Sequence, residues 1–339
     1  MKAARIHNYG EAEVIRLDEI ERPRPGEKQI VIKMRGSSLN HVDLSVRAGE
    51  LKLITQFQLP KTLGFDLVGE VAECGAGVTS FLKGQRVAAM TGMAAGGAAE
   101  YCCVDQDQAA RLPEGLEWAE AAAAPLAGCT ALQALRDSGG LAPGERVLVW
   151  GASGGVGHFA VQIAGVLGAS RVDAVASGRN AAMLAGLGAD AVADYTKQEV
   201  PEGPYDLIID TVATASMRTL RSMLAEGGRV VTVGSVAGTG LLGPAAALLR
   251  RVVAAKFLRM NHRGAIAKVA HDDLVQLASW LEDGRIAPVV HHAGALEDVA
   301  GAVRELEAGH VAGKLTIAVS ADARASREAS TRAGADPRG

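Results

Sequence analysis

A cluster of glycines between an apolar strand pattern and an apolar helix pattern is the stretch of this sequence that most clearly predicts chemistry. It reads RVLVWGASGGVGHFAVQIA, residues 146–164. Glycine has no Cβ, so its backbone can turn sharply and its N–H group can approach a ligand closely, at an entropic cost to folding. A strand, a glycine-rich turn and a helix N-terminus together form a site for the diphosphate of a dinucleotide. We therefore predict a phosphate site at this junction.

The spacing assigns a mechanical role to individual residues of the turn. The pattern is Ala152-x-Gly154-x-x-Gly157. Its first position makes the tight turn, Gly154 lets backbone amides reach the diphosphate, and Gly157 lets the helix pack closely on the strand. A lone glycine-rich pattern is often only a turn, but several strand and helix patterns follow this one, which favours a nucleotide site. The predicted cofactor-binding turn comprises Ala152, Ser153, Gly154, Gly155, Val156 and Gly157.

The end of the second strand pattern favours NADP(H) over NAD(H). Proteins that bind NAD place Asp or Glu roughly 20 residues beyond the glycines to hold the ribose 2′-hydroxyl. Ser177 and Arg179 occupy this region instead, and a hydroxyl and a guanidinium suit a 2′-phosphate. The alternative is that Arg179 is a solvated surface residue. Tyr195 closes the third strand pattern and is either near the adenosine or an ordinary half-buried tyrosine.

Strand and helix patterns alternate through the middle of the chain. After RVLVWG, apolar strand patterns recur in RVDAVAS, AVADY, YDLIIDTV and RVVTVGS. This alternation predicts an α/β fold with a doubly wound parallel sheet. Val212, which ends the fourth strand, and Gly234 and Ser235, which end the fifth, are expected to line the cofactor channel. Short alternating strands with glycine-rich turns before residue 110 predict a barrel-like domain.

The composition excludes several classes of protein. The chain has 339 residues, enough for two domains, and 48% of them are hydrophobic. A net charge of -3 without a long basic block argues against nucleic-acid binding. No apolar run has the length of a membrane span and the N-terminus lacks a signal-peptide core, so we expect a cytoplasmic protein without a membrane partner. The four cysteines form no C-x-x-C pair and are expected to be reduced structural thiols.

Several motifs together resemble a known family. In chain order they are SLNHVDLSVRAG, LGFDLVGEVAECGAGVTSFLKGQRV, GGAAEY, PLAGCTALQAL, GASGGVGHFAVQIA and a late AGK. From residue 1 to about 320 the chain resembles the medium-chain dehydrogenase/reductase superfamily, and within it the zinc-free quinone oxidoreductase and enone reductase branch. The resemblance implies a GroES-like catalytic domain built from both ends of the chain, a central Rossmann domain, a cofactor between them, and a homodimer. The expected divisions are 1–122 (catalytic domain, first part), 123–261 (Rossmann, NADP(H)-binding), 262–320 (catalytic domain, C-terminal part) and 321–339 (disordered tail).

The motifs of zinc-dependent members of the superfamily are incomplete in this chain. Ser38, in GSSLNHVD, stands where they have the early cysteine ligand, and Phe65 stands where they have the histidine of G-H-E. Neither side chain can hold zinc usefully. We expect no metal. Without a Lewis acid, a hydride acceptor must already be electrophilic, as quinones and α,β-unsaturated carbonyls are.

The resemblance also implies roles for two residues. Asn40 matches the asparagine of an N-x-x-D motif and is expected to bind the nicotinamide ribose or the substrate oxygen, or to cap a helix that begins at His41. Thr130 matches a position beside the nicotinamide, or bonds back to its own helical turn. Ser45 replaces a tyrosine, and Ala312 an arginine, found in some relatives, so no general acid is assigned.

The predicted function is an NADPH-dependent, zinc-independent reductase that transfers hydride to a quinone or an α,β-unsaturated carbonyl. Two alternatives are a cofactor-binding scaffold with little turnover and a pathway-specific enoyl reductase. The predicted partner is a small electrophilic molecule.

Overall fold

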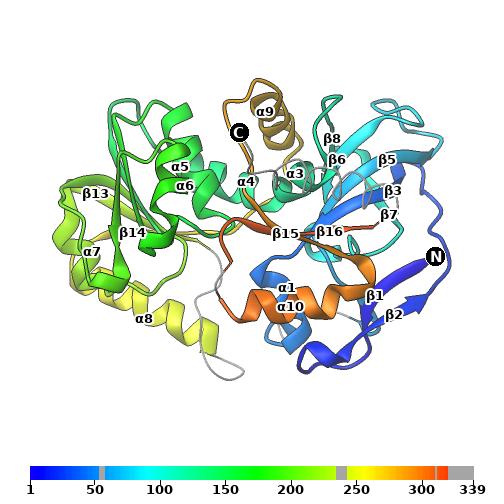
Figure 1. Cartoon of the computed structure of the whole chain (residues 1–339), viewed down its shortest axis with the longest axis horizontal. Coiled ribbons are helices and arrows are strands. Elements are labelled where there is room, and N and C mark those ends of the chain that lie inside the picture. The colour runs from blue at the N-terminus through cyan, green and yellow to red at the C-terminus, as the bar shows by residue number, and fades with distance from the viewer. Residues whose placement is uncertain (53–57, 234–242, 310, 320–339) are drawn as a thin grey trace, which may run out of the picture.

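The computed structural model describes the chain except for residues 53–57, 234–242, 310 and 320–339. The described residues form two lobes, one around a parallel sheet and one around a curled mixed sheet (Figure 1). The predicted tail at 321–339 lies outside the described residues, as do Gly234 and Ser235.

Six parallel strands make the first sheet, in the order β11–β10–β9–β12–β13–β14. The chain starts at the central strand β9, builds outward in one direction and then returns to build in the other. This is the doubly wound order of a Rossmann fold, so the predicted fold class is confirmed. The strands are β9 (Arg146–Trp150), β10 (Arg171–Ala176), β11 (Ala191–Asp194), β12 (Tyr205–Asp210), β13 (Leu224–Val233) and β14 (Asn261–Ala265).

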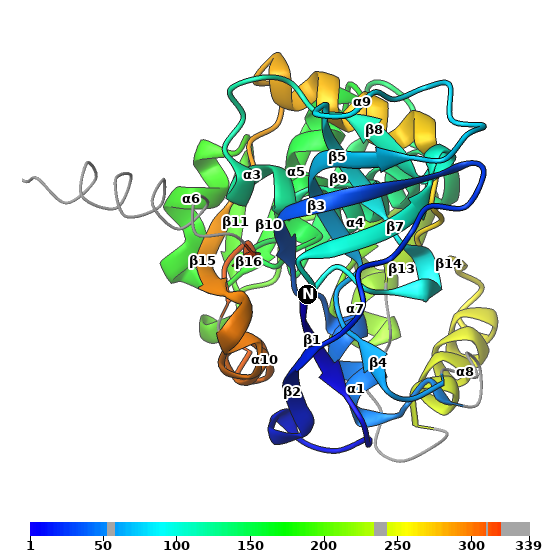
Figure 2. The same cartoon turned by 90° about the vertical axis from the view of Figure 1, so that its right-hand side faces the viewer.

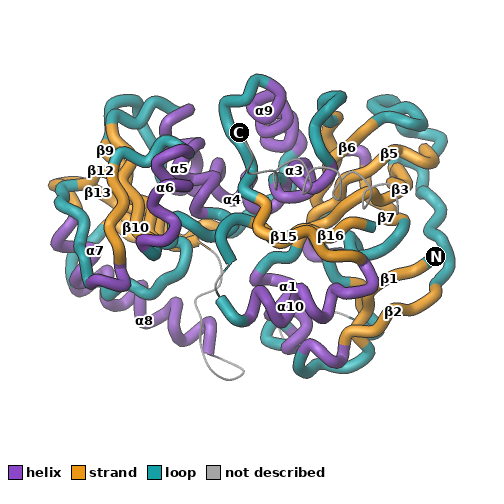
Figure 3. Tube along the Cα trace, viewed as in Figure 1, coloured by secondary structure: helices purple, strands orange, loops and turns teal. Residues whose placement is uncertain are grey.

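Helices cover both faces of this sheet (Figure 3). Successive residues of a strand point to opposite faces. Accordingly Val147 and Val149 of β9 share one buried cluster with α4, α5 and α9, whereas Leu148 shares another with α7 and α8. Both faces of the sheet are therefore buried, which explains the nearly continuous apolar runs in the strands. The helices are α4 (Pro125–Gln133), α5 (Gly157–Val166), α6 (Ala181–Gly186), α7 (Met217–Met223), α8 (Gly243–Phe257) and α9 (His271–Glu282).

The parallel sheet continues past residue 261, where the sequence analysis ended the domain. Strand β14 begins at Asn261, and Leu277 and Trp280 of α9 lie in the core of the same lobe. The segment NHRGA is polar and contains glycine, so it lacks the β-branched residues that favour a strand. It is a strand because it pairs with β13, a long-range interaction that local patterns do not report.

The second lobe is built from both ends of the chain, as the resemblance implied. Its larger sheet has the order β15–β16–β3–β5–β6–β8, with β7 paired to β3. The late strand β16 pairs antiparallel with β3, placing Thr316 opposite Ser38. Figure 2 views this lobe from its own side. The strands are β1 (Lys2–Ile6), β2 (Ile15–Glu19), β3 (Gln29–Ser38), β4 (Lys61–Thr62), β5 (Asp66–Cys74), β6 (Arg86–Met90), β7 (Tyr101–Asp105), β8 (Ala109–Arg111), β15 (Val290–Ala295) and β16 (Lys314–Ala318).

Three further helices belong to the second lobe. They are α1 (His41–Ala48), α3 (Trp118–Ala123) and α10 (Val299–Glu307). The helices α3 and α10 pack against the lobe's strands, α1 packs against α10, and all three bring apolar residues into its core. In the described part of the chain, no helix combines the length and the apolar composition needed to cross a membrane.

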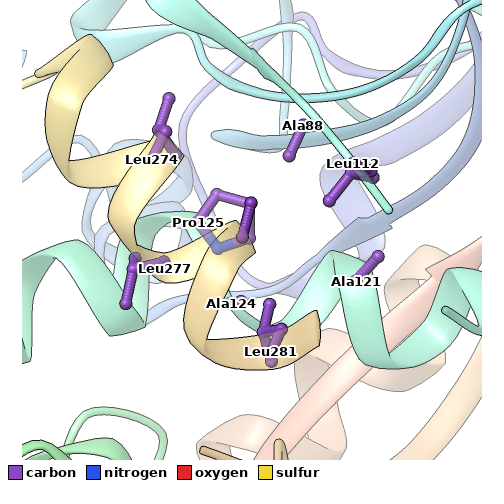
Figure 4. A pocket seen from close by; sticks show the side chains of 9 residues that line it. Ala88, Leu112, Ala121, Ala124, Pro125, Leu274, Leu277 and Leu281 are labelled. Atoms are coloured by element: carbon purple, nitrogen blue, oxygen red, sulfur yellow. The ribbon is translucent and has the colours of Figure 1, made fainter. Parts of the chain in front are cut away.

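A small apolar hollow lies at the seam between the lobes, where α9 faces the beginning of α4 and the barrel (Figure 4). All of its lining side chains are hydrocarbon, so it offers no group for binding or acid–base chemistry, and we assign it to packing between the lobes. The lining residues are Ala88, Leu112, Ala121, Ala124, Pro125, Leu274, Leu277, Ala278 and Leu281.

Candidate active site

The turn between β9 and α5 has the geometry of a phosphate site. Gly151 is left-handed, with φ of +80°, and its N–H and that of Ala152 both donate to the carbonyl of Val175 on β10. The tight turn is thus made by Gly151, one residue before Ala152, the position to which the sequence analysis assigned it. Ala152 is fully buried behind the turn.

Gly157 brings the helix onto the strand. A Cβ built on Gly157 would lie 2.2 Å from the carbonyl oxygen of Gly151 and 2.7 Å from the Cα of Ala152. Both are backbone atoms that cannot move aside, so no larger residue fits. The close helix–strand packing expected at this position is present.

Gly154 differs from Gly157 in that no protein group near it would clash with a larger side chain. A Cβ there would meet the oxygen of Gly151 at 3.5 Å, an ordinary contact. In the described part of the chain, the backbone N–H groups of Ser153, Gly155 and Val156 donate to no protein acceptor. Bare backbone and available amides at the start of a helix are what a diphosphate needs. The turn therefore fits a dinucleotide.

The ends of β10 and β11 bring the predicted adenosine-side residues together. Ser177 and the exposed Arg179 follow β10, and Tyr195 follows β11 with 58% of its surface exposed. This exposure leaves the ring of Tyr195 available for stacking, in contrast to the half-buried alternative. A carboxylate that the sequence analysis did not consider, Asp194, lies 2.3 Å from the position of a Cβ on Gly178.

Asp194 is occupied by local hydrogen bonds. Its Oδ1 accepts from the backbone N–H and the hydroxyl of Thr196, at 3.0 and 2.7 Å. These bonds to Thr196, more than any other contact, lower the pKa of the Asp194 carboxyl. The carboxylate thus holds the β11 turn against the β10 turn.

Val212 lies against the same glycine turn. The Cγ atoms of Val212 are 2.8 and 3.0 Å from the position of a Cβ on Gly151, and 45% of the side chain is exposed. The carboxyl ends of β9 and β12 therefore meet at one edge of the sheet, as expected for a ligand crevice.

A buried polar network lies on the other side of the turn, in the second lobe. The amide Nδ2 of Asn40 donates to Asp66 Oδ2 at 2.7 Å, and the Lys314 ammonium donates to Asn40 Oδ1. Lys314 and Asp66 are 3% and 0% exposed and their charged atoms are 3.7 Å apart. Ser38 Oγ also donates to Asp66. Burial lowers the pKa of Lys314, and the two nearby aspartates oppose that shift.

Asn40 also precedes helix α1, so the alternative role is present too. Helix α1 begins at His41, and Asp43 Oδ2 accepts from the backbone N–H of Asn40 at 2.9 Å. Asp43 Oδ1 accepts from the N–H of Gly64 at 2.8 Å. Burial raises the pKa of the Asp43 carboxyl to about 7 despite these two hydrogen bonds. Asn40 and Asp43 thus form a capping box at the start of α1, and the side chain of Asn40 also belongs to the network.

Thr130 occupies the first turns of α4, whose beginning is tied to the same network. The N–H of Leu126 donates to Asp66 Oδ1 at 2.6 Å. The hydroxyl of Thr130 donates to the carbonyl of Leu126 at 2.5 Å, which is the bond to its own helical turn considered above. A role beside the nicotinamide stays a prediction for Thr130.

The residues Gly313 and Lys314 connect the two halves of the site. The N–H of Gly313 donates to the carbonyl of Ser153 at 2.8 Å, and a Cβ on Gly155 would lie 2.9 Å from Lys314 Cδ. The phosphate turn of one lobe therefore contacts the network of the other directly. The sequence analysis quoted Lys314 and Asp66 within motifs but gave neither a role. The available signal was a charged residue at the start of a largely apolar strand, Lys314 in KLTIAV and Asp66 in DLVGEV, although the second strand also carries Glu70.

His158, the second residue of α5, is fully buried beside this junction. Its Nδ1 lies 3.0 Å from the carbonyl of Gly154, and its Nε2 has no partner among the described residues. Burial lowers the pKa of His158 to about 4, so the ring is neutral at physiological pH.

The described residues contain no group of three or more His, Cys, Asp or Glu side chains placed to hold a metal ion. Asp66 binds Ser38, Asn40 and Leu126 instead. The expected absence of a metal remains a prediction.

Comparisons with known proteins agree with this arrangement. A family model described as an alcohol dehydrogenase GroES-like domain matches residues 26–114, and one described as a zinc-binding dehydrogenase matches residues 187–317. The 2-methylene-furan-3-one reductase of Solanum lycopersicum is 33% identical over 94% of this chain and 79% of its own length. The chloroplastic NADPH-dependent alkenal/one oxidoreductase of Arabidopsis thaliana is 32% identical with the same coverage.

Among solved structures, the quinone oxidoreductase from Coxiella burnetii superposes with a TM-score of 0.84 at 30% identity, covering 94% of this chain and 99% of that one. One assignment follows from the parallel sheet with its glycine turn, the GroES-like lobe that β16 completes, and these relatives. The chain belongs to the medium-chain dehydrogenase/reductase superfamily, in its quinone oxidoreductase branch.

Proposed function

We propose that this protein is an NADPH-dependent, zinc-independent reductase of quinones or α,β-unsaturated carbonyls. The observation that carries the proposal is the direct contact between a phosphate turn and a polar network that ends in Asn40. Two relatives support the substrate class: one is named an NADPH-dependent alkenal/one oxidoreductase and the other a chloroplast envelope quinone oxidoreductase homolog.

The fit of the cofactor rests on the turn itself. The amides of Ser153, Gly155 and Val156 would hold the diphosphate, and Gly154 would let it approach the backbone. Ser177 and the guanidinium of Arg179 would hold the 2′-phosphate, with Tyr195 against the adenosine. The expected residues Gly234 and Ser235 belong to the proposed channel but lie outside the described residues.

Bound NADPH supplies a hydride. The protein's contribution is to bind, orient and keep out water. The amide of Asn40 donates a hydrogen bond to the oxygen of the acceptor, where negative charge develops as hydride reaches the β-carbon of an enone. The α-carbon then takes a proton from solvent, as do the oxygens of a reduced quinone. Catalysis rests on positioning at the seam between the lobes.

The chemistry of the residues supports zinc independence. Phe65 directly precedes β5, where a zinc ligand would be needed, and Asn40 and Asp66 are already bound to Lys314. Quinones and enones need no Lewis acid, whereas simple ketones largely need one or a strong proton donor in its place.

The test uses NADPH and three acceptors: a benzoquinone, cyclohexenone, and cyclohexanone as the matched saturated ketone. We expect loss of NADPH absorbance with the first two only, at a rate unchanged after dialysis against EDTA. NADPH binding without turnover of any acceptor would instead favour a scaffold. Turnover of cyclohexanone, or inactivation by EDTA, would contradict zinc independence.

The homodimer implied by the resemblance is also a proposal, which light scattering after gel filtration would test. Cytoplasmic location stays a prediction, since several relatives are named as chloroplastic or mitochondrial.

A further inference from the structure

We propose that Lys314 and Asp66 are positioning residues that fix the orientation of the Asn40 amide, and that this orientation sets the rate of hydride transfer. The inference rests on the proposed function and extends it to two residues that do not touch the substrate. It starts from the opposite charges that contact the two ends of one amide.

The two ends of the Asn40 amide face groups of opposite charge. Asn40 Oδ1 accepts from the Lys314 ammonium, and Nδ2 donates to the Asp66 carboxylate at 2.7 Å. A rotated amide would place its NH₂ against the ammonium and its oxygen against the carboxylate. Both contacts would then be repulsive, so the charge pair permits one orientation.

Lys314 is itself held in place. Its ammonium also donates to the carbonyl of Leu39 at 3.0 Å, and Asp66 receives further bonds from Ser38 Oγ and from the N–H of Leu126 at 2.6 Å. The oxygens of Asp43, the other aspartate near Lys314, accept hydrogen bonds from the N–H groups of Gly64 and Asn40. The network is therefore closed around Asn40 by fixed partners.

The fixed amide leaves one donor available. Nδ2 carries two N–H groups and Asp66 is its single acceptor in the described part of the chain. Lys314, Asp66 and Ser38 are buried, whereas Asn40 is partly exposed. The second N–H of Asn40 would therefore be the donor offered to the acceptor, and only while the amide keeps its orientation.

The same lysine relates this donor to the phosphate turn. Lys314 Cδ lies 2.9 Å from the position of a Cβ on Gly155, and Gly313 bonds to Ser153. The alkyl chain of Lys314 therefore passes across the turn before its ammonium reaches Asn40. A shorter or uncharged residue could not join both points.

The kinetic test compares Lys314→Met and Asp66→Asn with Asn40→Ala and the double variant Asn40→Ala/Lys314→Met. Removing one transition-state donor typically costs about 10²-fold in kcat, and we expect at least about tenfold from Lys314→Met and from Asp66→Asn. NADPH Kd should stay within about twofold of wild type, because the donors of the turn are untouched. The double variant should be no slower than Asn40→Ala alone, since Lys314 acts through Asn40.

Thr316→Val is the matched control. Thr316 lies two residues from Lys314 on β16, is 1% exposed, and its hydroxyl has no partner among the described residues. Its replacement should leave kcat, NADPH Kd and thermal unfolding close to those of wild type. A drop in kcat for this variant equal to that of Lys314→Met would overturn the inference, since any change in β16 would then suffice.

A second readout does not require turnover. In ¹⁵N-labelled protein without cofactor, the side-chain amide protons of Asn40 should exchange slowly with solvent and give one pair of signals. Lys314→Met and Asp66→Asn should speed that exchange or split the signals, and Asp66→Asn serves alone if Lys314→Met does not fold. Unchanged signals in a folded variant would overturn the inference, as would equal losses from Lys314→Met in the wild-type and Asn40→Ala backgrounds. If wild type reduces no acceptor, the proposed function fails, and the amide exchange still decides whether the charge pair orients Asn40.

Discussion

Replacing Gly157 by alanine tests the close approach of α5 to β9. The new Cβ would lie 2.2 Å from Gly151 O and 2.7 Å from the Cα and O of Ala152, all backbone atoms. Neither partner can rotate away, so the helix must retreat from the strand. Overpacking typically costs about 1–3 kcal/mol, and a backbone clash belongs at the upper end, about 3 kcal/mol. At roughly 2 °C per kcal/mol for a chain of this size, the unfolding midpoint should fall by about 6 °C.

The same displacement of α5 should weaken binding of the cofactor. The amides at the start of α5 would move relative to the sheet, and losing one hydrogen bond to a charged group costs about 1.5–3 kcal/mol, which is at least tenfold in NADPH Kd. The assays are thermal unfolding by circular dichroism and NADPH titration by fluorescence.

Gly165→Ala is the matched control in the same helix. A Cβ at Gly165 meets nothing within 4 Å, so alanine there should raise stability by about 0.5–1 kcal/mol through helix propensity and leave NADPH affinity unchanged. If Gly157→Ala melts and binds NADPH like wild type, the contact between α5 and β9 is not as close as described, and the reasoning about the turn is refuted.

Three further predictions concern charged or titratable groups. Arg179→Ala should weaken NADPH binding by about tenfold or more and leave NADH binding nearly unchanged, because a guanidinium bond to the 2′-phosphate is lost. An equal loss of affinity for both cofactors in competitive titrations would remove the argument for NADP(H). The pKa of buried His158 is lowered from 6.5 to about 4. As the pH drops from about 6.5 to about 4, the unfolded state therefore binds a proton that the folded state does not, and the free energy of unfolding falls by about 3 kcal/mol. Thermal unfolding of His158→Gln should show a smaller loss of stability across this range, and an unchanged dependence on pH would contradict the assignment. Arg251→Met should cost about 3–5 kcal/mol, measured by thermal unfolding, because it leaves the fully buried Asp210 without its cationic partner; a change below about 1 kcal/mol would show that Asp210 is not buried as a charge.

Local sequence patterns predicted those parts of the fold that depend on residues close together in the sequence. Apolar runs such as RVLVW and YDLIID identify strands buried on both faces, and the spacing of Gly157 requires only its own turn. Strand β14 could not be predicted this way, since NHRGA is a strand through its pairing with β13. The turn-making role of Gly151 was missed because two glycine spacings overlap in GASGGVG and only the backbone angle separates them.

The candidate site was predicted in part for the same reason. The glycine turn and Asn40 were found because each lies in a continuous motif. Asp66 and Lys314 acquire their role by meeting residues far along the chain, as in the bond from Lys314 to Leu39 across 275 positions. A charge that ends an apolar strand signals burial with a partner, but the sequence does not name the partner.

The docking of Gly313 on Ser153 has a consequence for how the protein is made. During synthesis the parallel sheet and its glycine turn can form once α9 has left the ribosome, because the strands and helices of that lobe all precede residue 313. The proposed acceptor site is complete only when β16, the last strand described, has formed and Lys314 contacts Asn40. A nascent chain interrupted shortly before that point should therefore bind nucleotide without reducing an acceptor, so that turnover becomes possible only after Lys314 has been synthesised and β16 has paired with β3.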